Sequence, residues 1–247
     1  MKKGFTMFSI LFTMGIVALG GSSCHKSVNN ILPADSTVVV IPPPMPADSN
    51  SKTYLALGDS YTIGQSVADS ERFPAQTSAY LKAAGFNMKK PEYIATTGWT
   101  TAQLQSAIAS INPKGPYDVV TLLIGVNDQY QHIDTAGYRV RFTQLLQKSI
   151  ELAGNRTTHV FVLSIPDYSV TPFGGGSMTI RKEIDDFNAI NKQVTASFSI
   201  AYVDITPSTR LAASDPSLIA NDGLHPSGKE YKVWAQMLYP LVLQVLK

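Results

Sequence analysis

From Thr53 to the C-terminus, short apolar runs alternate with longer stretches in which apolar and polar residues mix. The apolar runs are rich in Val, Ile, Leu and aromatic residues and predict strands at residues 53–58, 92–96, 118–124, 159–165 and 200–205. Runs without polar alternation are typical of strands that are buried on both faces of a sheet. The alternation of such strands with helical segments predicts an α/β domain in which helices cover both faces of a parallel sheet.

Three of the mixed stretches show the 3.6-residue period of an amphipathic helix. Their apolar stripes run over residues 142–153, 180–198 and 234–246. Two further signals mark helix starts, because Ser227–Glu230 and Thr100–Gln103 both have the spacing of a capping box. The first of these precedes the last apolar stripe, and the second predicts an additional helix after the second strand.

Residues 1–23 predict a signal peptide. Lys2 and Lys3 are followed by a charge-free apolar run, residues 5–19, and then by small residues. That run is shorter than the roughly 20 residues that a membrane-spanning helix needs. The only cysteine, Cys24, follows the small residues directly. This arrangement resembles a bacterial lipoprotein signal, in which the cysteine is acylated and becomes the mature N-terminus.

Gly21 stands three residues before Cys24, where such signals usually carry a leucine. Two outcomes therefore stay open. One is a cell-envelope lipoprotein with a membrane anchor on Cys24. The other is ordinary cleavage near Ala18–Gly20, which leaves a secreted or periplasmic protein with a free thiol. Residues 24–52 are rich in proline and lack helical periodicity, so they predict a linker that leads into a single domain, residues 53–247.

Composition narrows the classes of function. The chain has 20 basic and 18 acidic residues, and removal of Lys2 and Lys3 with the signal peptide leaves 18 of each. Such a balanced charge does not favour nucleic acid as a partner. A single cysteine excludes an internal disulfide. No spacing of His, Cys, Asp and Glu indicates a metal site, and we expect neither a metal nor a cofactor.

Candidate functional residues follow the predicted strands. Ser60, in the sequence Gly-Asp-Ser, comes after the first strand, Gly98 after the second and Asn127 after the third. Asp222 and His225 stand three positions apart after the fifth strand, just before the last helix. Each residue alone has an ordinary interpretation, such as a helix N-cap for the serine and turns for the glycine and asparagine. Their order and their places at strand ends make the functional interpretation specific.

This ordered set, which opens on Gly-Asp-Ser, resembles the four blocks of the SGNH or GDSL hydrolase family over residues 53–247. The resemblance implies a three-layer α/β/α sandwich whose five-stranded parallel sheet has the flavodoxin-like order 2-1-3-4-5. Sites of open parallel sheets form at the carboxyl ends of strands, near the point where the strand order reverses. With this order we expect Ser60, Gly98 and Asn127 at one edge of the sheet, with the loop of His225 folding back across it.

The chemistry of these residue types assigns roles. A serine hydroxyl is a poor nucleophile at neutral pH and needs a base, for which His225 is the candidate. Asp222 can orient the imidazole, in the Asp-x-x-His arrangement of the family. The backbone N–H groups of Ser60 and Gly98 and the amide of Asn127 are expected to form an oxyanion hole. We therefore predict a serine esterase, lipase or acylhydrolase that acts through an acyl-enzyme without a metal.

Two questions stay open at this point. The alternative function is a non-catalytic glycan-binding module on the same scaffold, whose mark would be the loss of Ser60 or His225. Within the enzyme interpretation, the substrate is either a lipid acyl ester or an acetylated carbohydrate. The loops at residues 129–137, 167–178 and 207–221 are expected to set this specificity.

Other polar residues have more modest interpretations. His132 is expected to line the substrate site, whereas His159 is expected to have a structural role at the start of the fourth strand. Asp59 and Asp128 are expected to bond loop backbones rather than to act chemically. The three glycines at 174–176 lack the lysine and the helix start of a phosphate-binding loop, and they predict a flexible segment.

Overall fold

The computed structural model describes residues 50–247. The predicted signal peptide, Cys24 and most of the predicted linker lie outside the described residues. The described chain begins beside the sheet, where the N–H of Lys52 donates to the carbonyl of Asn87 at 2.7 Å. The carbonyl of Lys52 in turn accepts from the N–H of Lys89 at 2.9 Å. These bonds hold the first described residues against the segment that leads into the second strand.

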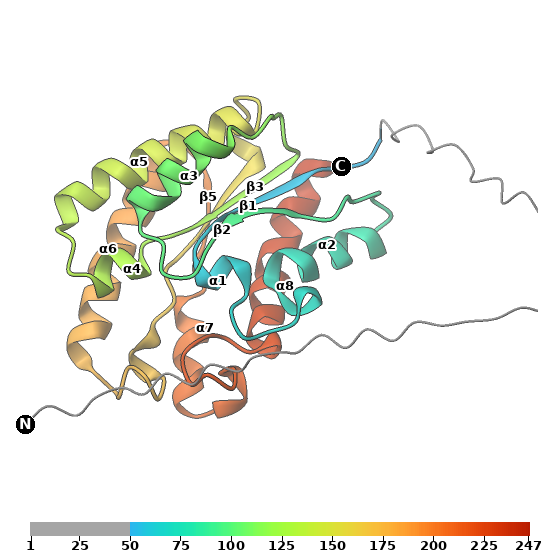
Figure 1. The fold of residues 1–247 in the computed structure, drawn as a ribbon. Coiled ribbons are helices and arrows are strands. Elements are labelled where there is room, and N and C mark those ends of the chain that lie inside the picture. Colours follow the sequence, from blue (N-terminus) through green and yellow to red (C-terminus); the bar gives the residue numbers. More distant parts are fainter. Residues whose placement is uncertain (1–49) are drawn as a thin grey trace, which may run out of the picture. The chain divides into compact units, whose positions relative to one another are not determined.

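The sheet consists of the strands β1 (Tyr54–Gly58), β2 (Glu92–Ala95), β3 (Val119–Leu123), β4 (Val160–Leu163) and β5 (Ala201–Val203). Each strand lies within a predicted run and ends at most two residues before that run does. All pairs are parallel, and the order is β2-β1-β3-β4-β5 (Figure 1). The α/β class and the strand order 2-1-3-4-5 are therefore confirmed.

Helices cover both faces of this sheet. The α-helices are α1 (Ser60–Ile63), α2 (Phe73–Ala83), α3 (Thr101–Ile111), α4 (Val126–Tyr130), α5 (Thr135–Leu152), α6 (Met178–Ser197), α7 (Thr206–Arg210) and α8 (Gly228–Leu246). The 3-10 helices are η1 (Asp69–Glu71), η2 (Thr157–His159), η3 (Tyr168–Val170), η4 (Leu211–Ala213) and η5 (Pro216–Leu218). On one face α5 packs against α3 and α6, and on the other α2 packs against α8 (Figure 1). Within residues 50–247, every helix is too short or too polar to span a lipid bilayer.

The predicted apolar stripes face the sheet and form the core. Phe142 and Leu145 of α5, Ile184 of α6, and Trp234 and Leu238 of α8 are all fully buried. Burial of one such side chain contributes about 1.5–3 kcal/mol to the free energy of unfolding. The stripes therefore fix both helical layers on the sheet, and with them the loops that leave its carboxyl edge.

One of the two predicted capping boxes is complete. At Thr100–Gln103 the N–H of the first residue donates to the side-chain oxygen of the last at 2.8 Å. At the start of α8, Ser227 accepts from the N–H of Glu230 at 3.4 Å, as predicted. The carboxylate of Glu230 does not return to Ser227, because it accepts from Ser208 at 2.6 Å and from the indole of Trp234 at 2.7 Å. Both donors lie inside the fold and bond the same carboxylate oxygen, Oε1.

Candidate active site

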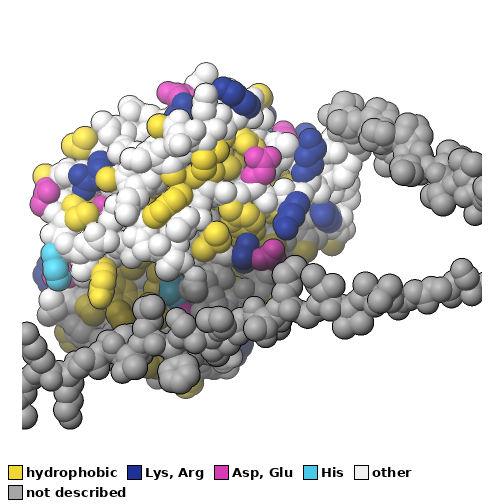
Figure 2. Space-filling model, in the orientation of Figure 1, with side chains coloured by type: hydrophobic (Ala, Val, Ile, Leu, Met, Phe, Trp, Pro, Cys, Tyr) yellow, Lys and Arg dark blue, Asp and Glu magenta, His cyan; other side chains and the backbone are white. Residues whose placement is uncertain are grey.

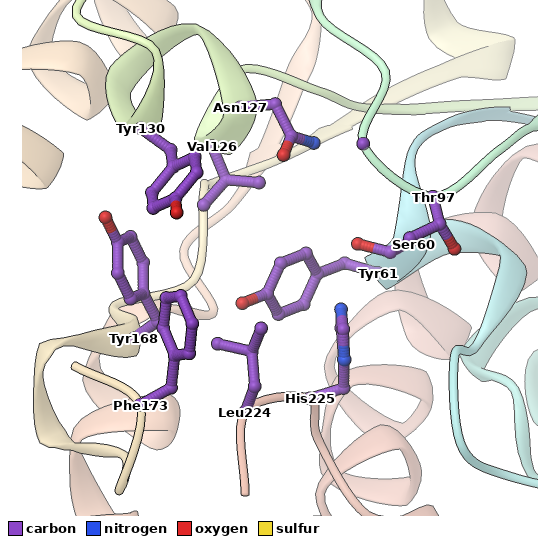
Figure 3. A pocket seen from close by; sticks show the side chains of 11 residues that line it. Ser60, Tyr61, Thr97, Val126, Asn127, Tyr130, Tyr168, Phe173, Leu224 and His225 are labelled. Carbon is purple, nitrogen blue, oxygen red and sulfur yellow. The ribbon is translucent and has the colours of Figure 1, made fainter. Parts of the chain in front are cut away.

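A pocket of about 170 Å³ opens at the carboxyl edge of the sheet, next to the ends of β1 and β3 (Figure 3). It contains four of the five residues predicted to act together, namely Ser60, Gly98, Asn127 and His225. The fifth, Asp222, is hydrogen-bonded to the ring of His225. The rest of the lining is mostly apolar and consists of Tyr61, Thr97, Val126, Tyr130, Tyr168, Phe173 and Leu224.

Ser60 is the first residue of α1 and follows β1 after one intervening residue. The N-cap of this helix is Asp59, whose Oδ1 accepts from the N–H of Tyr61 at 2.9 Å. The N-cap interpretation of Ser60 is therefore wrong, because its neighbour takes that position. The turn also depends on Gly58, where an added Cβ would lie 2.1 Å from Thr62 Oγ1. The chain can bend this tightly from strand to helix only without a side chain there.

Asp59 and Asp128 are fully buried and bond the backbone, as predicted, but the N–H groups that they accept from lie in the first turns of α1 and α3 rather than in loops. Burial raises the pKa of Asp59 to about 8, despite the hydrogen bond from Tyr61, and the nearby charge of Asp128 adds to this effect. Asp128 accepts from the N–H of Thr101 at 2.8 Å and from its hydroxyl at 2.5 Å. This pair ties the start of α3, just after Gly98, to α4 and so fixes Gly98 and Asn127 relative to each other.

Gly98 and Asn127 lie at the same side of the pocket. Gly98 has a φ of +84°, in the left-handed region that favours glycine, and a Cβ there would meet no atom within 4 Å. The backbone at this position is thus exposed toward the cavity. The side-chain amide of Asn127 donates to the carbonyl of Trp99 at 3.0 Å. That bond uses one of two amide hydrogens and fixes the orientation of the group.

The loop of His225 folds across the opposite side of the pocket. Nδ1 of His225 lies 2.7 Å from Oδ2 of Asp222, while Oδ1 accepts from the N–H groups of Leu224 and His225 at 3.0 and 2.9 Å. Partial burial by itself raises the pKa of Asp222. The bonds from Ser66, from these backbone groups and from the imidazole outweigh that effect and hold the pKa well below its usual range.

An ionised Asp222 makes Nδ1 of His225 the protonated nitrogen and leaves Nε2 as an acceptor. The imidazole is packed against the ring of Tyr61 at a centroid distance of 5.1 Å, and it points toward Ser60 in Figure 3. Within the described residues, no hydrogen bond joins the Ser60 hydroxyl to this ring. Such contacts often tighten only when a substrate binds.

An aromatic cluster forms the wall of the pocket away from Gly98. Tyr130, Tyr168 and Phe173 contact one another with ring centroids 6.0–6.5 Å apart. Tyr130 and Phe173 are 54% and 56% exposed. Figure 2 shows hydrophobic and charged side chains interspersed on the face of the molecule that it draws. The position of the Tyr168 ring is fixed by its hydroxyl, which donates to the side-chain oxygen of Gln129 at 2.9 Å. Exposed aromatic rings beside a pocket that holds a few polar groups are typical of a ligand-binding surface.

Two of the three predicted specificity loops contribute to this wall. Residues 129–137 supply Tyr130, and residues 167–178 supply Tyr168 and Phe173. The third loop, residues 207–221, supplies none of the residues that line this pocket. Sequence reasoning also missed Tyr61, Thr97, Val126 and Leu224. Each of them is adjacent in sequence to a predicted site residue, and this adjacency is the signal by which they are found.

The remaining predictions had mixed outcomes. His132 is exposed and borders a separate hollow beside Asp134, so its assignment to the substrate site is wrong. Nδ1 of His159 donates to the carbonyl of Asp118 at 2.7 Å, which confirms its structural role. The glycines 174–176 form a hydrogen-bonded turn, in which the N–H of Gly176 donates to the carbonyl of Ser169 at 2.8 Å.

A parallel sheet in this order, with a serine, a glycine, an asparagine and an Asp-x-x-His pair gathered at its carboxyl edge, defines the SGNH class of hydrolases. Residues 56–233 match the model of the GDSL-like lipase/acylhydrolase family, which is more than half of the chain. The chain therefore belongs to this family and is a hydrolase. This finding favours the predicted enzyme over the non-catalytic glycan-binding module.

Solved structures agree in fold. TesA shares 17% identity and a TM-score of 0.62, over 78% of this chain and 99% of that protein. The lipase Lip_vut3 from a goat rumen metagenome has 20% sequence identity and a TM-score of 0.62, and the match covers 77% of this chain and 97% of that protein. A lipase/acylhydrolase from Enterococcus faecalis has 18% sequence identity and a TM-score of 0.59, and the match covers 79% of this chain and 95% of that protein. At these identities the likeness shows the fold alone. A comparison with curated protein sequences finds no match.

Proposed function

We propose that this protein is a serine esterase that hydrolyses carboxylic esters through an acyl-enzyme on Ser60. The observation that supports this most is the common pocket of Ser60, Asn127 and His225, with Asp222 hydrogen-bonded to the far side of the imidazole. Attack of Oγ on the ester carbonyl forms the new C–O bond while Nε2 of His225 takes the hydroxyl proton. The imidazolium then protonates the leaving alcohol, and water releases the acid by the reverse sequence.

The negative charge that develops on the carbonyl oxygen needs donors that are already in place. The backbone N–H groups of Ser60 and Gly98 and the amide of Asn127 are the proposed donors. Each such donor typically contributes about 10²–10³ in kcat. The anchoring of Asn127 to Trp99 supports this role, because a fixed amide needs no reorganisation during the reaction. The chemistry proposed here requires neither a metal nor a cofactor.

We further propose that the acyl group is apolar and short to medium in length. Supporting this, the pocket wall consists of Val126, Leu224 and the aromatic cluster, and His225 is the only ionisable side chain besides the tyrosines in its lining. A sugar ring would need several polar partners, but Thr97 and Tyr168 already donate to Gln65 and Gln129. The volume of about 170 Å³ lies below the 300–1,000 Å³ of typical drug-sized sites and disfavours a long chain.

The test uses purified residues 50–247 and 4-nitrophenyl esters from acetyl to palmitoyl, with acetylated xylan and a lysophospholipid in parallel. We expect hydrolysis with a butyryl-to-octanoyl optimum, and covalent labelling of Ser60 by a fluorophosphonate. A folded protein that hydrolyses none of these esters and takes up no label would contradict the esterase. A sharp acetyl preference with release of acetate from xylan would instead establish carbohydrate deacetylation.

Phe173→Ala is expected to lower kcat/KM for the octanoyl ester about fivefold to tenfold, because the chain loses apolar contact area at the wall. The acetyl ester, which does not reach this ring, should change less than twofold. Ile111→Ala is the matched control, since Ile111 is also exposed, at 57%, but lies at the end of α3 outside the pocket. Equal losses for both esters would contradict an acyl-binding role of the aromatic cluster.

We also propose that Cys24 is lipidated and anchors the domain in the cell envelope. In a bacterial host, the full chain is expected to incorporate an alkyne-labelled fatty acid and to fractionate with membranes. Cys24→Ser should lose the label and appear in the soluble fraction, because only the cysteine thiol can be acylated in such a signal. A wild-type chain that is cleaved, soluble and unlabelled would support ordinary secretion.

A further inference from the structure

The turn that follows α1 links the three parts of the site. It begins at Gly64, which ends the helix with a φ of +68°. The N–H of Gln65 donates to the carbonyl of Ser60 at 3.0 Å, so the turn is attached to the first residue of the helix. The side-chain oxygen of Gln65 accepts from the hydroxyl of Thr97 at 2.7 Å, next to Gly98.

The next residue reaches the acid-base loop. The hydroxyl of Ser66 donates to Oδ2 of Asp222 at 2.6 Å, across 156 positions of sequence. Oδ2 is the same oxygen that faces Nδ1 of His225 at 2.7 Å. The other carboxylate oxygen is occupied by the N–H groups of Leu224 and His225. Among the hydrogen bonds of residues 50–247, the one from Ser66 is the bond that Asp222 receives from outside its own loop.

The backbone of Ser66 is unusual. Its φ of +67° lies in the left-handed region, which is sparsely populated by residues other than glycine, asparagine and aspartate. A glycine would adopt this turn without strain. Strained residues of this kind persist where the surrounding structure fixes them, and they cluster at functional sites. At position 66 the feature that a glycine would lack is the hydroxyl, and the hydroxyl is bonded to Asp222.

We propose that Ser66 is a positioning residue of the acid-base pair, a role that rests on the esterase mechanism proposed above. Its hydroxyl holds Oδ2 of Asp222 against Nδ1 of His225, and it withdraws part of the charge that the carboxylate directs at the imidazole. The bond also couples the loop of the base to the helix of the nucleophile. The other titratable groups that face the pair are Tyr61 from α1 and Tyr231 from α8, and burial raises the pKa of both, so they stay neutral.

Ser66→Gly tests the hydroxyl while it preserves the turn. We expect kcat/KM for the preferred ester to fall about tenfold, because a hydrogen bond to a charged group is lost. The acid limb of the pH profile should move up by about half a unit, because the carboxylate with one donor fewer stabilises the imidazolium more strongly. An asparagine adopts the left-handed backbone readily and keeps a hydrogen-bond donor. Ser66→Asn should therefore retain most of the wild-type kcat/KM, with the acid limb of the pH profile at its wild-type position.

Ser199→Gly is the matched control, since Ser199 is exposed, has a φ of +55° and follows α6 rather than α1. It should leave both kcat/KM and the pH profile unchanged. The proposal is overturned if Ser66→Gly behaves like Ser199→Gly, or if its activity falls with an unmoved acid limb and without recovery in Ser66→Asn. Wild-type turnover is measured in the same assay. If it is absent, the esterase proposal fails, whereas normal wild-type turnover with an unaffected Ser66→Gly variant refutes the positioning role alone.

Discussion

Ser60→Ala is expected to lower kcat/KM for an activated ester by at least about 10⁴-fold, because no other group in the pocket can form the acyl-enzyme. The oxyanion donors and the apolar wall remain, so a small rate above that of water should persist. The measurement is the hydrolysis of 4-nitrophenyl butyrate, together with fluorophosphonate labelling detected by mass spectrometry. The variant should show no label and only this small residual turnover.

The same substitution should leave the fold intact. Ser60 is 4% exposed and its side chain caps no helix, because Asp59 fills that position. We therefore expect the free energy of unfolding to change by less than about 1 kcal/mol. Ser70→Ala, an exposed serine in η1, is the control for activity. A folded Ser60→Ala protein that keeps a tenth of the wild-type rate would refute the assignment of the nucleophile.

The fold was predictable because its three central strands, β1, β3 and β4, are buried on both faces. Burial on both faces gives an apolar run without alternation, such as residues 118–124, and such runs are distinct from the amphipathic stripes of the helices. The family resemblance added the strand order. With the order given, the site followed, since Ser60, Gly98 and Asn127 are each tied to a strand end and therefore to one edge of the sheet.

The contacts that the sequence did not predict are those that packing decides. Glu230 has the spacing of a capping box, yet its Oε1 bonds two donors inside the fold, because the side chain is buried against Ser208 and Trp234. His132 was misplaced for a related reason, since proximity in sequence to Asn127 does not fix the direction of a loop. The bond between Ser66 and Asp222 joins segments 156 positions apart, and no local pattern marks it.

Asp222 lies three residues before His225 and is bonded to its imidazole, so a change of this carboxylate should strongly lower the rate of hydrolysis. Asp222→Asn is expected to lower kcat/KM by about 10⁴-fold while the protein stays folded. In the wild type, Oδ1 accepts from the N–H groups of Leu224 and His225, so the amide oxygen of an asparagine must take that place. Its NH₂ group then faces Nδ1 of His225. Two donors cannot share one bond, so the imidazole must carry its proton on Nε2 and can no longer act as the base.

The pH profile distinguishes this tautomer effect from a general loss of structure. The pKa of Asp222 lies well below its usual range, so in the wild type the acid limb reports the imidazole and not the carboxylate. Removal of the negative charge should move that limb to lower pH, opposite to the shift expected for Ser66→Gly. Asp215→Asn is the control, because Asp215 has a partly exposed carboxylate, precedes η5 and pairs with Lys229 at the start of α8. If Asp222→Asn loses activity but the acid limb of its pH profile stays at the wild-type position, Asp222 holds the loop in place rather than determining which ring nitrogen of His225 carries the proton.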